Sequence, residues 1–154
     1  MSTSHLRILA VVLTALALVP AGAHLLELPN KMALLRDDYV TVQSIYSGWA
    51  LLGAVLIAAL VSDLALAVSL RRDRRAGGLA LLGGLLIAVS LAIFFVWVFP
   101  ANQATGNWTS VPANWKALRA HWEYGHAVNA IVTFAALWAV TAAAIRPTTA
   151  DPPQ

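Results

Sequence analysis

The sequence contains no cysteine. Disulfides, thiol nucleophiles, thiolate zinc sites and cysteine-ligated iron–sulfur clusters are therefore excluded. Charged residues are also scarce, because Asp, Glu, Lys and Arg together make up 11% of the 154 residues, whereas a soluble domain carries about 25%. So few charges cannot form the surface of a water-soluble globule of this length. The composition predicts a lipid bilayer as the main partner, and no nucleic acid.

Long apolar runs fill most of the chain. They are placed at residues 6–26, 45–70, 79–99 and 123–145. Each has close to the 20 or so residues that cross the hydrocarbon core as a helix. The sequence predicts an all-α fold, with one membrane domain over residues 1–146 built as an up-down-up-down four-helix transmembrane bundle. Residues 147–154 are predicted to be a disordered tail, and Gly77–Gly78 to be the turn before the third helix.

Arginines predict the orientation of the bundle. Six of the eight arginines lie at the start of the first run, after the last run and in the loop between runs two and three, at Arg7, Arg71, Arg72, Arg74, Arg75 and Arg146. Because basic residues favour the cytoplasmic side, we expect a multi-pass protein of the cell membrane with both termini in the cytoplasm. Loops 27–44 and 100–121 are then external.

The first run has a second interpretation. Arg7, the apolar stretch 8–19 and the small residues 21–23 also fit a cleaved secretory signal peptide. The run continues through Leu25 and Leu26, which favours a retained membrane span.

Paired ionisable residues lie at the predicted outer ends of the first and last helices. His24 and Glu27 are three positions apart, as are Glu123 and His126, so each pair shares a helix face. We predict that these four residues converge and are the catalytic candidates. A polar line continues into the membrane through Asn129 and, four residues later, Thr133.

The same four residues are candidate ligands of a single metal ion, because Glu-x-x-His is a ligand pattern of helical bundles. Haem held by the two histidines is an alternative. The competing interpretation is a structural cluster in which the carboxylates pair with Lys31, Arg36 or Arg119.

Two further features have competing interpretations. Asp63, inside the second run, is expected to pair with Arg71 or Arg72 or to bond to Ser62 or Ser69, rather than to relay protons or ions. Three tryptophans repeat every seven residues, at Trp108, Trp115 and Trp122. A surface helix with these rings facing lipid is favoured over a lining of a substrate site.

Several segments of the outer loops resemble the anthrone oxygenase-like membrane proteins, the DUF1772 family. The segments are residues 24–31 (HLLELPNK), 43–49 (QSIYSGW), 100–109 (PANQATGNWT), 114–119 (NWKALR) and 122–127 (WEYGHA). The resemblance spans about residues 6–145, and its specific part is the Trp-Glu-x-x-His segment with the upstream Trp-x-x-Leu-Arg. Asn129 departs from the family pattern, which often has a basic residue there.

The resemblance implies a four-helix membrane bundle and the oxygenation of a lipophilic phenolic substrate, such as an anthrone, without a required cofactor. Proton removal by His126, oriented by Glu123, would start the reaction, and Asn102, Asn107 or Arg119 would hold the developing oxyanion. The substrate-binding candidates are Asn30, Tyr46, Asn102, Asn107, Trp108, Arg119 and Trp122. The alternative is a non-catalytic membrane subunit or small transport component, as a homo-oligomer or with a larger membrane partner.

Overall fold

The computed structural model describes residues 2–147, so all of the predicted tail beyond Pro147 lies outside the described residues. The described part is mostly helical and contains no strand. Its elements are α1 (Thr3–Ala33), α2 (Arg36–Gln43), η1 (Ser44–Tyr46), η2 (Trp49–Leu52), α3 (Gly53–Ser69), α4 (Arg74–Ile93), the π-helical turn η3 (Phe94–Val98), α5 (Phe99–Thr105) and α6 (Trp115–Ala144).

Four helical rods in this set are long and apolar enough to cross a membrane. They are α1, η2 with α3, α4 continued through η3 into α5, and α6. Large apolar side chains such as Val19, Val61 and Phe134 are exposed around the bundle, as expected where lipid is the solvent. The chain is a multi-pass, all-α membrane protein.

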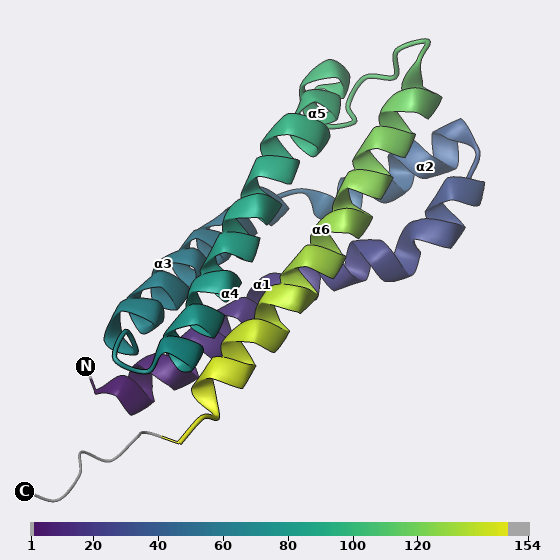
Figure 1. The fold of residues 1–154 in the computed structure, drawn as a ribbon. Coiled ribbons are helices and arrows are strands. Elements are labelled where there is room, and N and C mark those ends of the chain that lie inside the picture. The colour runs from purple at the N-terminus through teal and green to yellow at the C-terminus, as the bar shows by residue number, and fades with distance from the viewer. Residues whose placement is uncertain (1, 148–154) are drawn as a thin grey trace, which may run out of the picture.

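The rods form a closed ring. Helix α1 packs against α3 and α6, and α4 packs against the same two helices. Figure 1 shows the start of α1, the α3–α4 turn and the end of α6 together at one end of the bundle, with α2 and α5 at the other. These two ends are named inner and outer after the orientation that the arginines predict. The up-down-up-down prediction is confirmed, and it makes α1 and α6 neighbours although no short loop joins them.

Small residues let the rods approach closely. Ala10, Ala59, Ala80 and Ala136 are fully buried. A Cβ atom added at Gly84 of α4 would lie 2.9 Å from the Leu64 side chain of α3. Close approach of this kind supplies the van der Waals contact that holds helices together in lipid.

At the inner end of the bundle, the structure corrects the predicted position of the turn before the third helix. Helix α4 begins at Arg74, capped by the Asp73 side chain, which accepts from the amides of Arg75 and Ala76 at 3.0 Å each. Gly77–Gly78 therefore lies inside α4 and is not the turn. A Cβ atom at Gly77 would lie 3.0 Å from a backbone carbonyl oxygen of the preceding turn, so a glycine there allows the chain to fold back tightly.

The outer ends of the rods extend beyond the predicted runs. With 31 residues, α1 is about 46 Å long at 1.5 Å per residue, against about 30 Å of hydrocarbon. It continues to Ala33, and α6 already begins at Trp115. The stretches predicted as loops 27–44 and 100–121 are thus largely helical, and their polar side chains are held by rigid elements.

Candidate functional site

Lys31 lies at the centre of a polar cluster at the outer end of the bundle. Its ammonium nitrogen is 2.8 Å from the Glu123 carboxylate of α6 and 3.9 Å from Glu27, one turn earlier on α1. The Lys31 and Glu123 side chains are 4% and 0% exposed, whereas Glu27 is 36% exposed. A buried carboxylate is costly unless a cation and hydrogen bonds satisfy it, and Lys31 supplies that cation.

Two tyrosines complete this charge network. The Tyr39 hydroxyl, from α2, donates to Glu123 at 2.9 Å. The Tyr46 hydroxyl, from η1, donates to Glu27 and accepts from the Lys31 ammonium at 3.1 Å. Burial, and the carboxylate beside each ring, raise the pKa of both phenols well above their usual range, so both remain hydrogen-bond donors at neutral pH.

Two stacked imidazoles lie deeper in the bundle. The rings of His24 and His126 are 4.1 Å apart at an interplanar angle of 30°. Trp122 meets both rings edge-on, at 4.3 Å from His126 and 4.9 Å from His24, and Tyr46 lies 4.6 Å from His24. The predicted convergence of helices α1 and α6 at this level is therefore seen in the structure.

The Glu123 and His126 side chains have different partners, which corrects the predicted mechanism. Glu123 bonds to Lys31 and Tyr39, and the described contacts include none between its carboxylate and His126. Although the two residues are three positions apart, the Glu123 side chain belongs to the charged network around Lys31. The His126 side chain belongs to the aromatic cluster of His24 and Trp122. His126 is therefore not oriented by Glu123.

Two of the three tryptophans in the seven-residue repeat, Trp108 and Trp122, are buried, which corrects the lipid-facing interpretation. Trp108 and Trp122 are 5% and 4% exposed, and Trp108 packs edge-on against Tyr39 at 5.0 Å. Trp115 and Trp122 belong to the continuous helix α6 and not to a separate helix lying on the membrane. The Trp122 indole donates to the Asn102 side chain at 2.7 Å, so α5 fixes the ring that covers the histidines.

The three residues predicted to hold an oxyanion bond to other groups or are exposed, although the Nε donor of buried Arg119 has no partner. Asn102 is bonded to Trp122. Asn107 is an exposed turn residue with a φ of 56°. Arg119 donates to the carbonyl of Leu34 at 2.9 Å, past the end of α1, and its guanidinium stacks 4.8 Å from the Trp115 ring. The donor that sequence reasoning overlooked is Lys31, which it treated only as a counter-ion.

The donor set does not fit a metal ion. Within residues 2–147 no group of three or more His, Asp or Glu side chains is placed to hold one. The Lys31 ammonium occupies the space between the two carboxylates. Imidazole lone pairs lie in the ring plane, so stacked rings direct them side by side and not toward a shared ion. The structural alternative, carboxylates paired with Lys31, describes this geometry; Arg36 instead pairs with Asp37.

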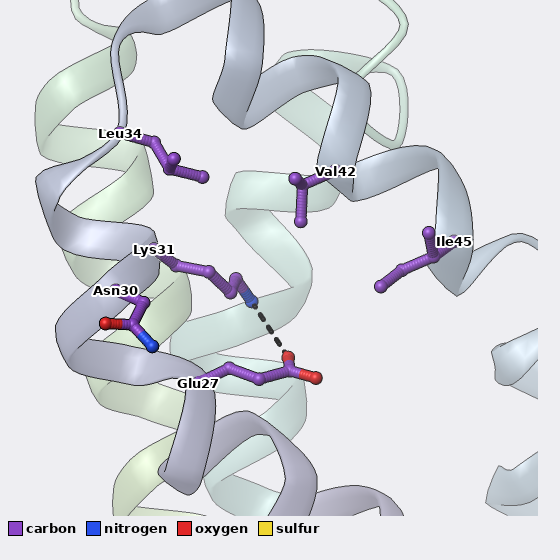
Figure 2. A pocket seen from close by; sticks show the side chains of 6 residues that line it. All are labelled: Glu27, Asn30, Lys31, Leu34, Val42 and Ile45. Atoms are coloured by element: carbon purple, nitrogen blue, oxygen red, sulfur yellow. Dashed lines mark ion pairs between the residues drawn. The ribbon is translucent and has the colours of Figure 1, made fainter.

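A cavity of about 320 Å³ opens beside the charged network around Lys31, between α1 and the α2–η1 segment (Figure 2). Glu27 and Lys31 supply its charged groups and exposed Asn30 lies at its edge, while the aliphatic side chains come from Leu34, Val42 and Ile45. Its volume is near the lower limit of small-molecule sites, which combine apolar walls with a few polar groups. The arrangement suits a ring-shaped apolar molecule with one hydroxyl or carbonyl group.

Asp63 lies apart from this cluster, and its predicted partners are wrong. Its side chain is fully buried in the bundle and accepts from the Thr14 hydroxyl of α1, at 3.2 and 3.3 Å to its two oxygens. Ser62 and Ser69 donate instead to carbonyls of their own helix, as does Arg71.

Comparison with known proteins identifies no relative for this arrangement. No family model, no curated protein and no solved structure matches the chain. The likeness to the anthrone oxygenase-like proteins therefore rests on the sequence segments quoted above, and the function must be inferred from the site.

Proposed function

We propose that the protein is an oxidoreductase of the anthrone oxygenase type, which takes a lipophilic phenolic or quinol-like substrate from the membrane and oxidises it at the outer end of the bundle. The observation that carries this proposal is the cavity in which Lys31 and Glu27 lie among Leu34, Val42 and Ile45. A substrate that partitions into lipid would enter it from the bilayer with its apolar rings against the aliphatic walls.

Lys31 and Glu27 divide the chemistry between them. Glu27 is the exposed carboxylate of the cluster, and it would remove a proton from the acidic C–H of an anthrone. The Lys31 ammonium would stabilise the negative charge that develops on the neighbouring oxygen. The sequence analysis predicted His126 as the base and Asn102, Asn107 or Arg119 as the oxyanion donor; this proposal gives the two roles to Glu27 and Lys31, which line the cavity.

The overall oxidation is balanced with molecular oxygen as the oxidant. The carbanion adds O2 to form a C–O bond and a hydroperoxide, and loss of water then leaves the ketone of the quinone. The CH2 group loses two hydrogens and gains one oxygen atom, and the second oxygen atom leaves as water.

Oxygen consumption by the detergent-purified protein tests this function. With a hydroxyanthrone the protein should consume one O2 for each quinone formed. Glu27→Gln preserves the shape of the side chain and should lower kcat by about 10²-fold or more, as the loss of a general base does. Asp38→Asn removes an exposed carboxylate on α2 and is the matched control.

The outcome that contradicts the proposal is equally plain. If wild-type protein consumes no O2 with either a hydroxyanthrone or a lipophilic quinol, the oxygenase function is wrong. The same conclusion follows if Glu27→Gln and Asp38→Asn have equal activity.

A non-catalytic membrane subunit is the second candidate. The observation that favours it is the bonding of buried groups between helices: Glu123 is bonded to Lys31 and Tyr39, and Arg119 to backbone carbonyls. Such a cluster would clamp α1, α2 and α6 together for a partner. Purification from native membranes with a larger permease or oxidase, lost in Glu27→Gln, would support this function instead.

A further inference from the structure

The Asp63–Thr14 pair is the second polar site in the bundle, and it takes no part in the outer cluster. Both side chains are fully buried, and they join α3 to α1. A Cβ atom at Gly83 of α4 would lie 3.5 Å from Asp63 Oδ2 and 3.4 Å from Val140 of α6. All four rods therefore meet at this carboxyl.

No cation neutralises the Asp63 side chain. Within the described residues it forms no ion pair, and its bonded partner is a hydroxyl. The nearest charged side chains along the neighbouring helices, Arg7, Arg75 and Arg146, lie about 9 Å or more from its level at 1.5 Å per residue. Arg7 donates to carbonyls at the end of α6, at 2.9 and 3.2 Å. A carboxyl buried in this way is most stable as the neutral acid, because an ionised one would be uncompensated.

The surroundings of Asp63 differ on its two sides. Toward the inner surface it meets a packed apolar cluster that includes Leu66, Leu70 and Val140. Toward the outer surface, beyond Ser62, whose hydroxyl donates to its own helix, lie Thr133 of α6 and Ser90 of α4, whose hydroxyls are 3.4 Å apart and whose side chains are 1% and 3% exposed. Thr133 lies seven residues, or about 10 Å, outward from Val140 along α6.

Polar groups continue from there to the histidine pair. Asn129 lies one turn further out on α6, is 6% exposed, and its side-chain oxygen has no bonding partner. His24 Nδ1, at the level of the stacked rings, is also buried without a partner. Buried acceptors left in this state are places where water binds or a proton passes.

We propose that Asp63 and Thr14 form a proton-binding site in the membrane interior, which exchanges its proton with the outer end of the bundle through Ser90, Thr133 and Asn129. The apolar inner cluster closes the site toward the cytoplasm. The polar groups that connect it outward end at His24 and His126, so the site stores one proton that is reached from one side. This inference is independent of the reaction proposed for the cavity.

Infrared spectroscopy of the protein in lipid nanodiscs tests the proposal. A carbonyl stretch of a protonated carboxylic acid should be present in wild-type protein, absent in Asp63→Asn, and shifted after transfer to D2O. The rate of that shift measures proton exchange at Asp63. Ser90→Ala with Thr133→Val should slow it at least about tenfold, since each change removes a hydrogen-bonding step worth about 1 kcal/mol or more.

Thr141→Val is the matched control, because Thr141 lies on α6 beside the apolar groove formed with Phe134 and Trp138; its rate should equal that of wild type. Asn129→Leu is a second, independent block if the double variant fails to fold by size-exclusion chromatography, and it should also slow exchange. The proposal is overturned if Asp63→Asn removes no acid band, or if a folded blocked variant exchanges as fast as Thr141→Val.

Discussion

Among single residues, Lys31 determines whether the outer cluster is stable. It is the cation shared by both glutamates of the chain, and its ammonium also lies 4.5 Å from the Trp122 ring and 4.6 Å from the Tyr46 ring. Removing one member of a buried ion pair leaves the other charge uncompensated, which costs more than the pair contributes when intact.

Lys31→Met should therefore lower the free energy of unfolding by about 3 kcal/mol or more, because Glu123 would remain buried without its cation. Thermal unfolding in detergent measures this. The control is Lys116→Met, which changes the other lysine, an exposed one on the same level of α6, and should alter stability by no more than about 0.5 kcal/mol. Equal melting temperatures for the two variants would refute the central role of Lys31.

The phenols give a prediction about pH. Because the pKa values of Tyr39 and Tyr46 are raised by burial, the unfolded chain loses these protons near pH 10 while the folded protein keeps them. Stability is thus unaffected below pH 10 and should fall as pH rises above it. Absorbance titration should show phenolate from these two residues only above pH 10, and Tyr39→Phe with Tyr46→Phe should remove that late step. Appearance of phenolate absorbance from these two residues already near pH 10 would contradict the prediction.

Sequence spacing predicts part of this site. The i, i+3 rule places His24 with Glu27 and Glu123 with His126, and the bundle brings all four to the outer end. Spacing does not reveal that a lysine one turn beyond Glu27 enters the site, since a lysine at a helix end usually extends into solvent. The Glu123 carboxylate attracts it because that carboxylate is fully buried and costly without a cation.

Among the elements, the α4–η3–α5 rod shows why one glycine of α6 is required. The rod passes through a π-helical turn immediately before Pro100, where the missing amide of proline interrupts regular hydrogen bonding. This turn presses against α6: a Cβ atom at Gly125 would lie 2.7 Å from Val98 and 3.5 Å from Trp97.

Gly125→Ala should destabilise the protein by about 1–3 kcal/mol, because the added methyl group would displace the π-helical turn from α6. Gly22→Ala on α1 is the matched control, since nothing lies within 4 Å of its Cβ position; it should be neutral or stabilising by up to about 1 kcal/mol. Melting temperatures compare the two. Adding Val98→Ala to Gly125→Ala should restore stability if the clash is the cause, and no recovery would show that it is not.

The ends of the elements are where sequence reasoning is least accurate. Apolar runs end where polar side chains begin, but backbone hydrogen bonding continues, so α1 extends past residue 26 to Ala33 and α6 begins before residue 123 at Trp115. The same extension explains the tryptophans. Once Trp115–Trp122 is part of a packed helix, its rings are covered by α2 and α5 instead of by lipid.

For the whole molecule, composition and run length are sufficient to predict the fold. Four spans in series leave few arrangements, and the simplest ring makes α1 and α6 neighbours, as observed. Side-chain pairing across that ring was not predictable, because it depends on the rotation of each helix, which apolar runs do not specify. The outer cluster and the Asp63 site both lie at such cross-helix contacts.

The orientation of the ring in the membrane is the last prediction. The α3–α4 turn carries Arg71, Arg72, Arg74 and Arg75 and should be cytoplasmic, with residues 100–121 outside. Because the chain has no cysteine, Arg74→Cys and Thr109→Cys each introduce a single thiol at an exposed position, at opposite ends of the bundle. An impermeant thiol reagent applied to intact cells should label position 109 and not position 74. Permeabilised cells should show both labelled, which confirms that each thiol is accessible. Labelling of position 74 alone in intact cells would reverse the orientation and place the Lys31 cluster and its cavity on the cytoplasmic side.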